Sequence, residues 1–181
     1  MTFAHYLSDS FNKMKEGVLP YLKNGNVLEF GSGLGGNLIS IHNFIERGVG
    51  VDINRFYVRK ANKLAYRTRA NNIKFTKYDG KAESLKGNFD SIFSIGVFER
   101  IPKEEVYKYV NQLKNIVNPD GRLILNFLSD RASNTEFTTR LGEESYIFWS
   151  AVDVNNLVRT LELKVLYYIK RAIVDEIIVT K

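Results

Sequence analysis

The feature that most constrains the fold of this chain is a glycine-rich turn between a short apolar run and a helical pattern. The run at residues 26–30 is short enough for a buried strand, and four of the next six residues are glycine. Apolar residues then recur at helical spacing from Leu38 to Ile45. The sequence therefore predicts a strand, a tight turn and a helix. Glycines let the backbone approach a ligand closely, and the start of the helix offers unpaired N–H groups.

The spacing of these glycines, and of an acidic residue after them, indicates a ligand that carries adenosine. Gly31, Gly33 and Gly36 spell G-x-G-x-x-G, and a second apolar run ends at Asp52, nineteen residues after Gly33. A carboxylate only accepts hydrogen bonds, so it suits the two neighbouring donors of a ribose diol. Asp52 also suits the start of a helix near Arg55, and the two roles are compatible. These features fit a dinucleotide and S-adenosylmethionine equally, so the identity of the ligand is open at this point.

A third strand, at residues 73–78, ends at Asp79 with Gly80 behind it, which predicts a further acceptor for an adenine amino group. Glu83 is a rival for that role. Further along, we expect a strand after Asn88, a helix opened by Pro102, and a helix opened by Ser150 and Asp153. The other predicted elements are a helix at 55–70, a turn at 118–121, and strands at 122–128, 164–168 and 176–180.

Composition limits the class of protein. The 181 residues suffice for one domain with a full core and are too few for separate cofactor and catalytic domains. The chain has no cysteine, which excludes disulfides and thiolate chemistry. No apolar run approaches the roughly 20 residues of a membrane helix, so we expect a cytoplasmic protein with no membrane contact. The net charge of +6 is spread among 20 acidic and 26 basic residues, which indicates an ordinary surface.

Four motifs in order resemble those of the class I S-adenosylmethionine-dependent methyltransferases of the type 11/25-like kind. They are E-F-G-S-G-L-G-G, G-V-D-I, F-D-S-I-F-S-I-G-V-F-E-R-I-P and V-N-P-D-G-R-L-I-L, and the resemblance is strongest over residues 18–128. It implies an α/β fold with one Rossmann-like, doubly wound domain. Its seven-stranded, mostly parallel sheet has the order 3-2-1-4-5-7-6, an antiparallel final strand, and helices on both faces.

The resemblance also implies which residues hold the cofactor. The methionine part would lie against Glu29 and the turn, the ribose against Asp52, and the adenine against Asp79 and Gly80. The full set of expected cofactor residues is Glu29, Gly31, Ser32, Gly33, Gly35, Asp52, Ile53, Asp79, Gly80, Ile95 and Gly96. The chain departs from the family where Arg100 replaces the usual His. A second departure is that the segment 79–85 is about two residues longer than usual. This leaves open whether Asp79 or Glu83 contacts the adenine.

The expected reaction is an in-line displacement, in which a nucleophile attacks the methyl group on the cofactor's positive sulfur. The protein would act mainly by alignment and by excluding water. No base is evident from the sequence, and Tyr6, Glu99 and Arg100 are weak catalytic candidates beside His5 and Asp130, each of which also has a structural explanation. Trp149 either stacks on a substrate or belongs to the core, and we favour the core. No metal site is predicted.

Two segments outside the motifs are expected to border the site. Residues 1–22 form an amphipathic helical segment that is either a lid over the cofactor or a cover for the core, and we favour the cover. Residues 129–149, after the fifth strand, are expected to contact the substrate. A basic stripe at Arg55, Arg59, Lys63 and Arg67 fits nucleic acid, although a solvated helix face is the better interpretation.

The predicted acceptor is the O, N or C nucleophile of a small molecule, used by a monomer or homodimer. RNA or protein methylation is an alternative, although the tetrapeptide that holds a flipped adenine is absent after the fourth strand. A nicotinamide dehydrogenase fits the glycines, but the chain lacks length for its substrate domain. Relatives of cyclopropane-fatty-acid synthase share S-I-G-V-F-E and are longer. A cofactor-binding partner subunit without catalysis is the remaining class.

Overall fold

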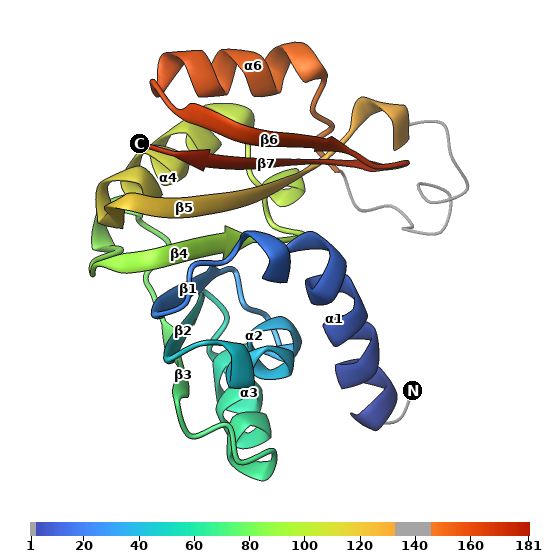
Figure 1. The fold of residues 1–181 in the computed structure, drawn as a ribbon, viewed down its shortest axis with the longest axis vertical. Helices are drawn as coiled ribbons and strands as arrows, with labels where there is room; N and C mark the ends of the chain where they lie inside the picture. The colour runs from blue at the N-terminus through green and yellow to red at the C-terminus, as the bar shows by residue number, and fades with distance from the viewer. Residues whose placement is uncertain (1–2, 133–145) are drawn as a thin grey trace.

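Seven strands form one sheet in the order β3-β2-β1-β4-β5-β7-β6 (Figure 1), in a computed structural model that describes residues 3–132 and 146–181. The strands are β1 (Asn26–Phe30), β2 (Arg47–Asp52), β3 (Ile73–Lys77), β4 (Phe89–Ser94), β5 (Val117–Leu128), β6 (Lys164–Lys170) and β7 (Val174–Thr180). The first five pair in parallel, and β7 runs antiparallel to both of its neighbours. The expected sheet order and the antiparallel final strand are confirmed.

Helices cover both faces of the sheet, as two separate apolar clusters show. The α-helices are α1 (Phe3–Gly17), α2 (Gly36–Ser40), α3 (Arg55–Arg67), α4 (Lys103–Ile116) and α6 (Ala151–Thr160). Buried side chains of α1, α2 and α3 pack together with Val27 and Phe93. Those of α4 and α6 pack with the neighbouring strand residues Leu28 and Ile92. Successive strand residues point to opposite faces, so the two clusters lie on opposite sides of the sheet.

The connection between β3 and β4 differs from the other parallel crossovers. The crossovers after β1, β2 and β4 each carry an α-helix, whereas the one after β3 carries only the single 3-10 turn η3 (Ala82–Ser84). The other short 3-10 turns are η1 (Leu19–Tyr21), η2 (His42–Phe44), η4 (Phe98–Arg100) and η5 (Asp130–Ala132).

Several predicted boundaries were wrong in detail. The helix predicted at 55–70 ends at Arg67, and the strand predicted at 164–168 continues to Lys170. The helix after the glycine turn ends at Ser40, and η2 follows it, so the apolar spacing to Ile45 spans two elements. The strand predicted to start at Arg122 starts at Val117. The predicted turn at residues 118–121 lies within that strand, where the pairing with β4 is irregular. Phe89 pairs with Val117 and Ser91 pairs with Arg122, so a step of two residues along β4 is matched by a step of five along β5. The last strand begins at Val174 rather than Glu176.

The start of α6 follows its predicted cap. The Ser150 hydroxyl accepts a hydrogen bond from the Asp153 N–H at 3.1 Å, and the Asp153 carboxylate accepts one from the Ser150 N–H at 2.8 Å. This reciprocal pair satisfies backbone groups that the first turn leaves open. Over the described part of the chain, no helix is both long and apolar enough to span a bilayer.

Candidate active site

The glycine turn joins β1 to α2 and is fixed to the end of β2. The Gly31 and Ser32 N–H groups both donate to the Val51 carbonyl at 2.9 Å. A Cβ on Gly35 would come within 2.7 Å of Phe75 and 2.9 Å of Ala61, so that position is closed by packing. A Cβ on Gly33 would meet nothing within 4 Å. The turn therefore leaves open space beside Gly33, where a ligand can approach the backbone.

Asp52 lies at the end of β2 and faces the glycine turn. One carboxylate oxygen accepts a hydrogen bond from the Gly33 N–H at 2.8 Å, and the other accepts one from the Asn54 N–H at 2.8 Å. Asn54, not Asp52, caps α3, since its side chain accepts from the Phe56 N–H at 2.9 Å. Each oxygen of the Asp52 carboxylate retains further acceptor capacity.

A cleft of about 520 Å³ opens between the carboxyl ends of β1, β2 and β4. Its lining is Gly31, Gly33, Asp52, Ile53, Asn54, Tyr57, Tyr78, Gly96, Val97, Arg100 and Ile101. Ligands of open α/β sheets bind at this kind of edge. The structure thus brings five predicted cofactor residues, from three separate parts of the chain, to one cleft: Gly31, Gly33, Asp52, Ile53 and Gly96.

The other predicted cofactor residues lie around this cleft or away from it. Ser32 and Gly35 form backbone hydrogen bonds that hold the turn. Ile95 packs against the apolar cluster formed by α1, α2 and α3. Asp79 is exposed and lines a neighbouring groove, and hydrogen bonds from the Ser84 hydroxyl and the Lys81 N–H hold its pKa below its usual value. The Gly80 carbonyl accepts a hydrogen bond from the Tyr109 hydroxyl. Neither Asp79 nor Glu83 lines the cleft, so a contact between one of these carboxylates and the adenine stays a prediction.

Sequence reasoning missed Tyr78, which lines the cleft at the end of β3. Its ring packs on Phe30 with centroids 5.7 Å apart, and burial raises the pKa of its hydroxyl. Tyr57, Asn54 and Ile101 were also missed. The available signal was position, because Tyr78 directly follows a strand whose carboxyl end points to the same edge as Asp52.

Glu29 is a buried carboxyl group behind the turn. One oxygen accepts a hydrogen bond from the Asn37 side chain at 2.9 Å, and the other has no partner among the residues that the structure describes. Burial raises the pKa of Glu29 to about 8, against the lowering effects of the Asn37 hydrogen bond and of the Leu38 backbone N–H. A cationic ligand group would supply the missing partner, because a buried charge is stable only when it is paired.

Helix α1 covers the core and also reaches the glycine turn. Met14 is fully buried in the cluster beneath it, so this helix covers part of the core, while its role as a lid over the cofactor stays a prediction. The Tyr6 hydroxyl accepts a hydrogen bond from the Gly36 N–H at 3.2 Å, and burial raises the pKa of Tyr6. His5 is exposed. The structure therefore places Tyr6 beside the site, whereas His5 is not among the residues that line the cleft.

Glu99 and Arg100 follow β4 on η4 and border the cleft. A Cβ on Gly96 would lie 3.5 Å from one Glu99 carboxylate oxygen, and the other oxygen is buried without a partner among the described residues. Burial raises the pKa of Glu99, and the neighbouring Arg100 lowers it. The Arg100 guanidinium donates to the Tyr146 hydroxyl at 2.9 Å and lies 5.0 Å from the centre of that ring.

The segment predicted to contact substrate is described only at its two ends. Trp149 is fully buried against Phe127, with ring centroids 4.8 Å apart, so its assignment to the core is confirmed. The Asp130 carboxylate accepts a hydrogen bond from the Ser129 hydroxyl at 3.3 Å. Residues 133–145 lie outside the described part. Within residues 3–132 and 146–181, no three His, Asp or Glu side chains gather as metal ligands would.

Comparison with solved structures supports the fold. Magnesium protoporphyrin IX methyltransferase from Synechocystis PCC 6803, with bound S-adenosylhomocysteine, has a TM-score of 0.73 and 19% identity, over 98% of this chain and 83% of that one. The PH0226 protein from Pyrococcus horikoshii OT3 has a TM-score of 0.78 and 22% identity, over 96% and 90%. Mitomycin 7-O-methyltransferase has a TM-score of 0.78 and 16% identity, over 98% and 54%.

Sequence comparison supplies the family. No curated protein sequence gives a significant match to the chain. A family model described as a methyltransferase domain matches residues 3–167, which is most of the chain. That match agrees with the four sequence motifs, with the strand order, and with the cleft beside the glycine turn. The chain therefore belongs to the methyltransferase domain family, within the class I S-adenosylmethionine-dependent methyltransferases.

Proposed function

We propose that this methyltransferase transfers the methyl group of S-adenosylmethionine to a nucleophile of a small molecule. The observation that carries the proposal is the cleft at the sheet edge, in which the glycine turn, Asp52 and the segment after β4 meet. These are the three regions at which the family motifs place the cofactor.

The residues around the cleft fit S-adenosylmethionine. The open space at Gly33 lets a ligand approach the backbone, and Asp52 retains acceptor capacity toward the hydroxyls of a ribose. The unpartnered oxygen of Glu29 fits the ammonium group of the methionine part. A dinucleotide would place its anionic pyrophosphate at the glycine turn, so the carboxyl of Glu29 beside that turn favours the methionine-bearing cofactor.

When bound, S-adenosylmethionine supplies a methyl group that its positive sulfur has already activated. The chain's own residues then act by positioning. Asp52 would orient the ribose, and Glu29 would release its proton to solvent and pair with the ammonium group. Tyr78 and Val97 form walls that exclude water from the cleft.

We propose Glu99 as the group that accepts a proton where the acceptor must lose one. Its carboxyl lies beside Gly96 at the cleft, its side chain is half-buried, and its raised pKa brings it closer to the range of an effective base near neutral pH. Arg100 lines the same cleft, where its guanidinium would attract an anionic acceptor. The hydrogen bond to the Tyr146 hydroxyl orients the Arg100 side chain.

A small molecule is the favoured acceptor because the names of two similar structures are those of enzymes acting on a porphyrin and on mitomycin. Against nucleic acid, the four residues of the basic stripe on α3 are exposed and none of them lines the cleft, as expected of a solvated face. The second candidate function is a cofactor-binding subunit without its own turnover, which Arg100 in place of the usual His favours. Cytoplasmic location and a monomeric or homodimeric state stay predictions.

The test is transfer of a labelled methyl group from S-adenosylmethionine into fractions of small molecules, RNA and proteins. We expect label in the small-molecule fraction. With Glu99→Gln, turnover should fall about 100-fold if the acceptor loses a proton, while the exposed Glu104→Gln should leave turnover unchanged. Label in RNA or protein alone contradicts the small-molecule proposal. Cofactor binding without label in any fraction favours the partner-subunit function.

A further inference from the structure

One part of the sheet lacks the helix that parallel strands usually carry. Parallel strands are normally covered on both faces by their crossover helices. Residues 78–88, which join β3 to β4, contain only η3. Along β3, Ile73 and Phe75 are buried toward α3, whereas Lys74 and Thr76 on the opposite face are exposed. Within residues 3–132 and 146–181, therefore, no α-helix covers β2 and β3 on the face that α4 covers elsewhere.

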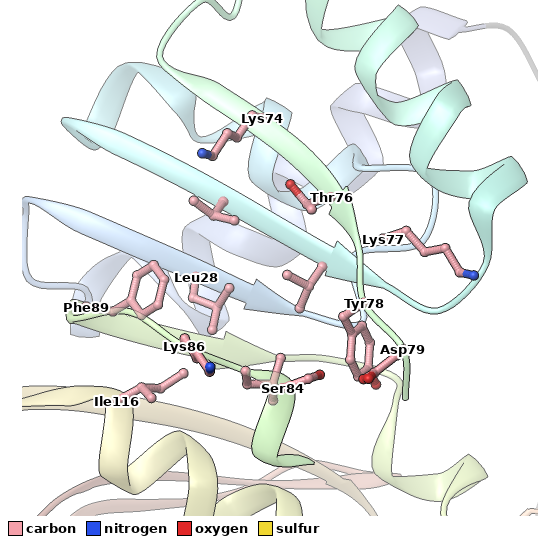
Figure 2. A pocket seen from close by; sticks show the side chains of 13 residues that line it. Leu28, Lys74, Thr76, Lys77, Tyr78, Asp79, Ser84, Lys86, Phe89 and Ile116 are labelled. Atoms are coloured by element: carbon pink, nitrogen blue, oxygen red, sulfur yellow. The ribbon is translucent and has the colours of Figure 1, made fainter. Parts of the chain in front are cut away.

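A groove of about 520 Å³ occupies this place (Figure 2). Its floor is apolar, with Leu28 and Val51 buried and Val49 half-buried on β1 and β2. Leu85 and Ile116 supply apolar groups from the η3 side and from the end of α4. The groove therefore offers the same kind of apolar sheet surface that α4 covers over the central strands.

Two lysines stand at the rim of this groove, and the one carboxylate of its lining, Asp79, lies beside Tyr78 at the end near the cofactor cleft. Lys74 comes from β3 and Lys86 from the opposite wall, while Lys77 extends away from the groove (Figure 2). Lys74 and Lys86 are exposed, and neither makes an ion pair or side-chain hydrogen bond with any residue in the described part of the chain. An apolar floor between unpaired cations is complementary to an amphipathic segment that carries acidic groups.

We propose that this groove binds an amphipathic helix from an acidic partner protein. The helix would take the place of the missing crossover helix, with its apolar side on Val49 and Leu85 and its carboxylates near Lys74 and Lys86. A partner helix as long as α3 or α4, which have 13 and 14 residues, would be long enough to cover β2 and β3. A second copy of this chain is disfavoured, because both copies carry a net charge of +6.

The groove and the cofactor cleft share only Tyr78 in their linings, although Asp79, which we predict to contact the adenine, lines the groove beside Tyr78. The residues on which the proposal depends, Lys74 and Lys86, do not line the cleft and are not predicted cofactor residues. Lys74, Thr76 and Lys86 are exposed, and none of them lines the cleft, so substitutions at these positions leave the cleft lining unchanged.

The test uses a fluorescent 14-residue helical peptide with leucines on one side and glutamates flanking them, titrated with the full-length protein at low salt. Fluorescence anisotropy should show saturable binding. The double variant Lys74→Glu with Lys86→Glu should weaken binding about tenfold, since two rim contacts change from attraction to repulsion. Thr76→Trp, which fills the groove from an exposed position, should weaken it as well.

Matched controls keep the result specific. Lys60→Glu with Lys63→Glu reverses two exposed charges on α3, away from the groove, and should leave the peptide's affinity unchanged. A peptide with lysines in place of the glutamates should not bind. Melting temperatures of all variants check that they are folded.

Four outcomes would overturn the proposal. They are the absence of saturable peptide binding, equal binding of the glutamate and lysine peptides, equal loss of binding in the α3 control, and retained binding when Thr76→Trp fills the groove. Binding of an RNA oligonucleotide or of decanoate at Lys74 and Lys86, with no binding of the acidic peptide, would assign the groove to another ligand class and also overturn it.

Discussion

Glu29 and Asp52 are two carboxyl groups of one site that lie in different surroundings. Asp52 accepts hydrogen bonds from two backbone N–H groups and retains capacity toward the cleft. Glu29 is 1% exposed, has one unpartnered oxygen, and has its pKa raised by burial to about 8. In the ligand-free protein at pH 7, Glu29 is therefore mostly protonated, and pairing with a ligand cation requires it to lose that proton.

The buried Glu29 predicts a pH dependence of stability. Its pKa is raised from the usual value of 4.5, so between that value and about 8 the folded state holds a proton that the unfolded state has released. The free energy of unfolding of the ligand-free protein should therefore fall as pH rises through this window. With Glu29→Gln this contribution disappears, and at pH 8 the melting temperature should exceed that of the wild type by on the order of 5 °C.

The measurement is a series of thermal melts from pH 5 to pH 8.5, with Glu104→Gln as the exposed control. The control should follow the wild-type profile. Equal pH profiles for the wild type and Glu29→Gln would show that the buried carboxyl does not titrate as described.

The glycine turn predicts that two neighbouring substitutions have different effects. Gly33→Ala meets no neighbouring atom, so its folding cost should be limited to about 1–2 kcal/mol for its φ of +50°. Gly35→Ala adds a clash with Phe75 and Ala61 to a similar backbone cost, and should lower the melting temperature further.

Affinity for S-adenosylhomocysteine separates the two roles. Gly33→Ala should remain folded and lose at least tenfold in affinity, because its methyl group fills the space that the ligand needs. Unchanged affinity of a folded Gly33→Ala variant would mean that the ligand does not approach the turn at this position.

At the scale of elements, the capping box predicts how firmly α6 is held. Ser150→Ala removes the hydroxyl that accepts from the Asp153 N–H, and should destabilise the protein by about 1 kcal/mol, or roughly 3 °C in melting temperature. Ser8→Ala, at an exposed position on α1, is the matched control and should change little. Equal melting temperatures for the two variants would contradict a stabilising cap.

Local sequence signals predicted the elements whose cause is local. The glycine turn, the box at Ser150 and the strand order implied by the family motifs all appear in the structure. The early start of β5 was not predictable, because Asn118, Pro119 and Gly121 are turn residues and only pairing of Val117 with Phe89 extends the strand. The short α2 has a similar explanation, since η2 continues the apolar spacing without continuing the helix.

The same distinction applies to the site. Asp52 and the glycines were predictable from their spacing, because the strand–turn–helix unit fixes how far apart they lie. The position of Tyr78 after β3 indicated the correct edge of the sheet, but its place in the cleft lining also depends on packing against Phe30 from a different strand, which the sequence does not show. Asn54 was missed as the cap of α3, since Asp52 two residues earlier is an equally good capping residue in the sequence.

At the scale of the whole molecule, the sheet order brings the functional segments together. β1 lies between β2 and β4, so the ends of three strands meet although their residues are widely separated in the chain. The cleft is then completed by Tyr78, from the end of β3, and by Arg100, from η4. Cofactor binding should therefore depend on single residues from each of these segments.

The most direct test of this account is titration calorimetry with S-adenosylmethionine, S-adenosylhomocysteine and NAD in separate runs. We predict micromolar binding of the first two and no binding of NAD. Asp52→Ala should weaken binding by about 3 kcal/mol, or roughly 100-fold, as two hydrogen bonds to a charged group are lost, while the exposed Asp120→Ala should bind normally. Binding of NAD alone, or unchanged affinity in a folded Asp52→Ala variant, would contradict the account.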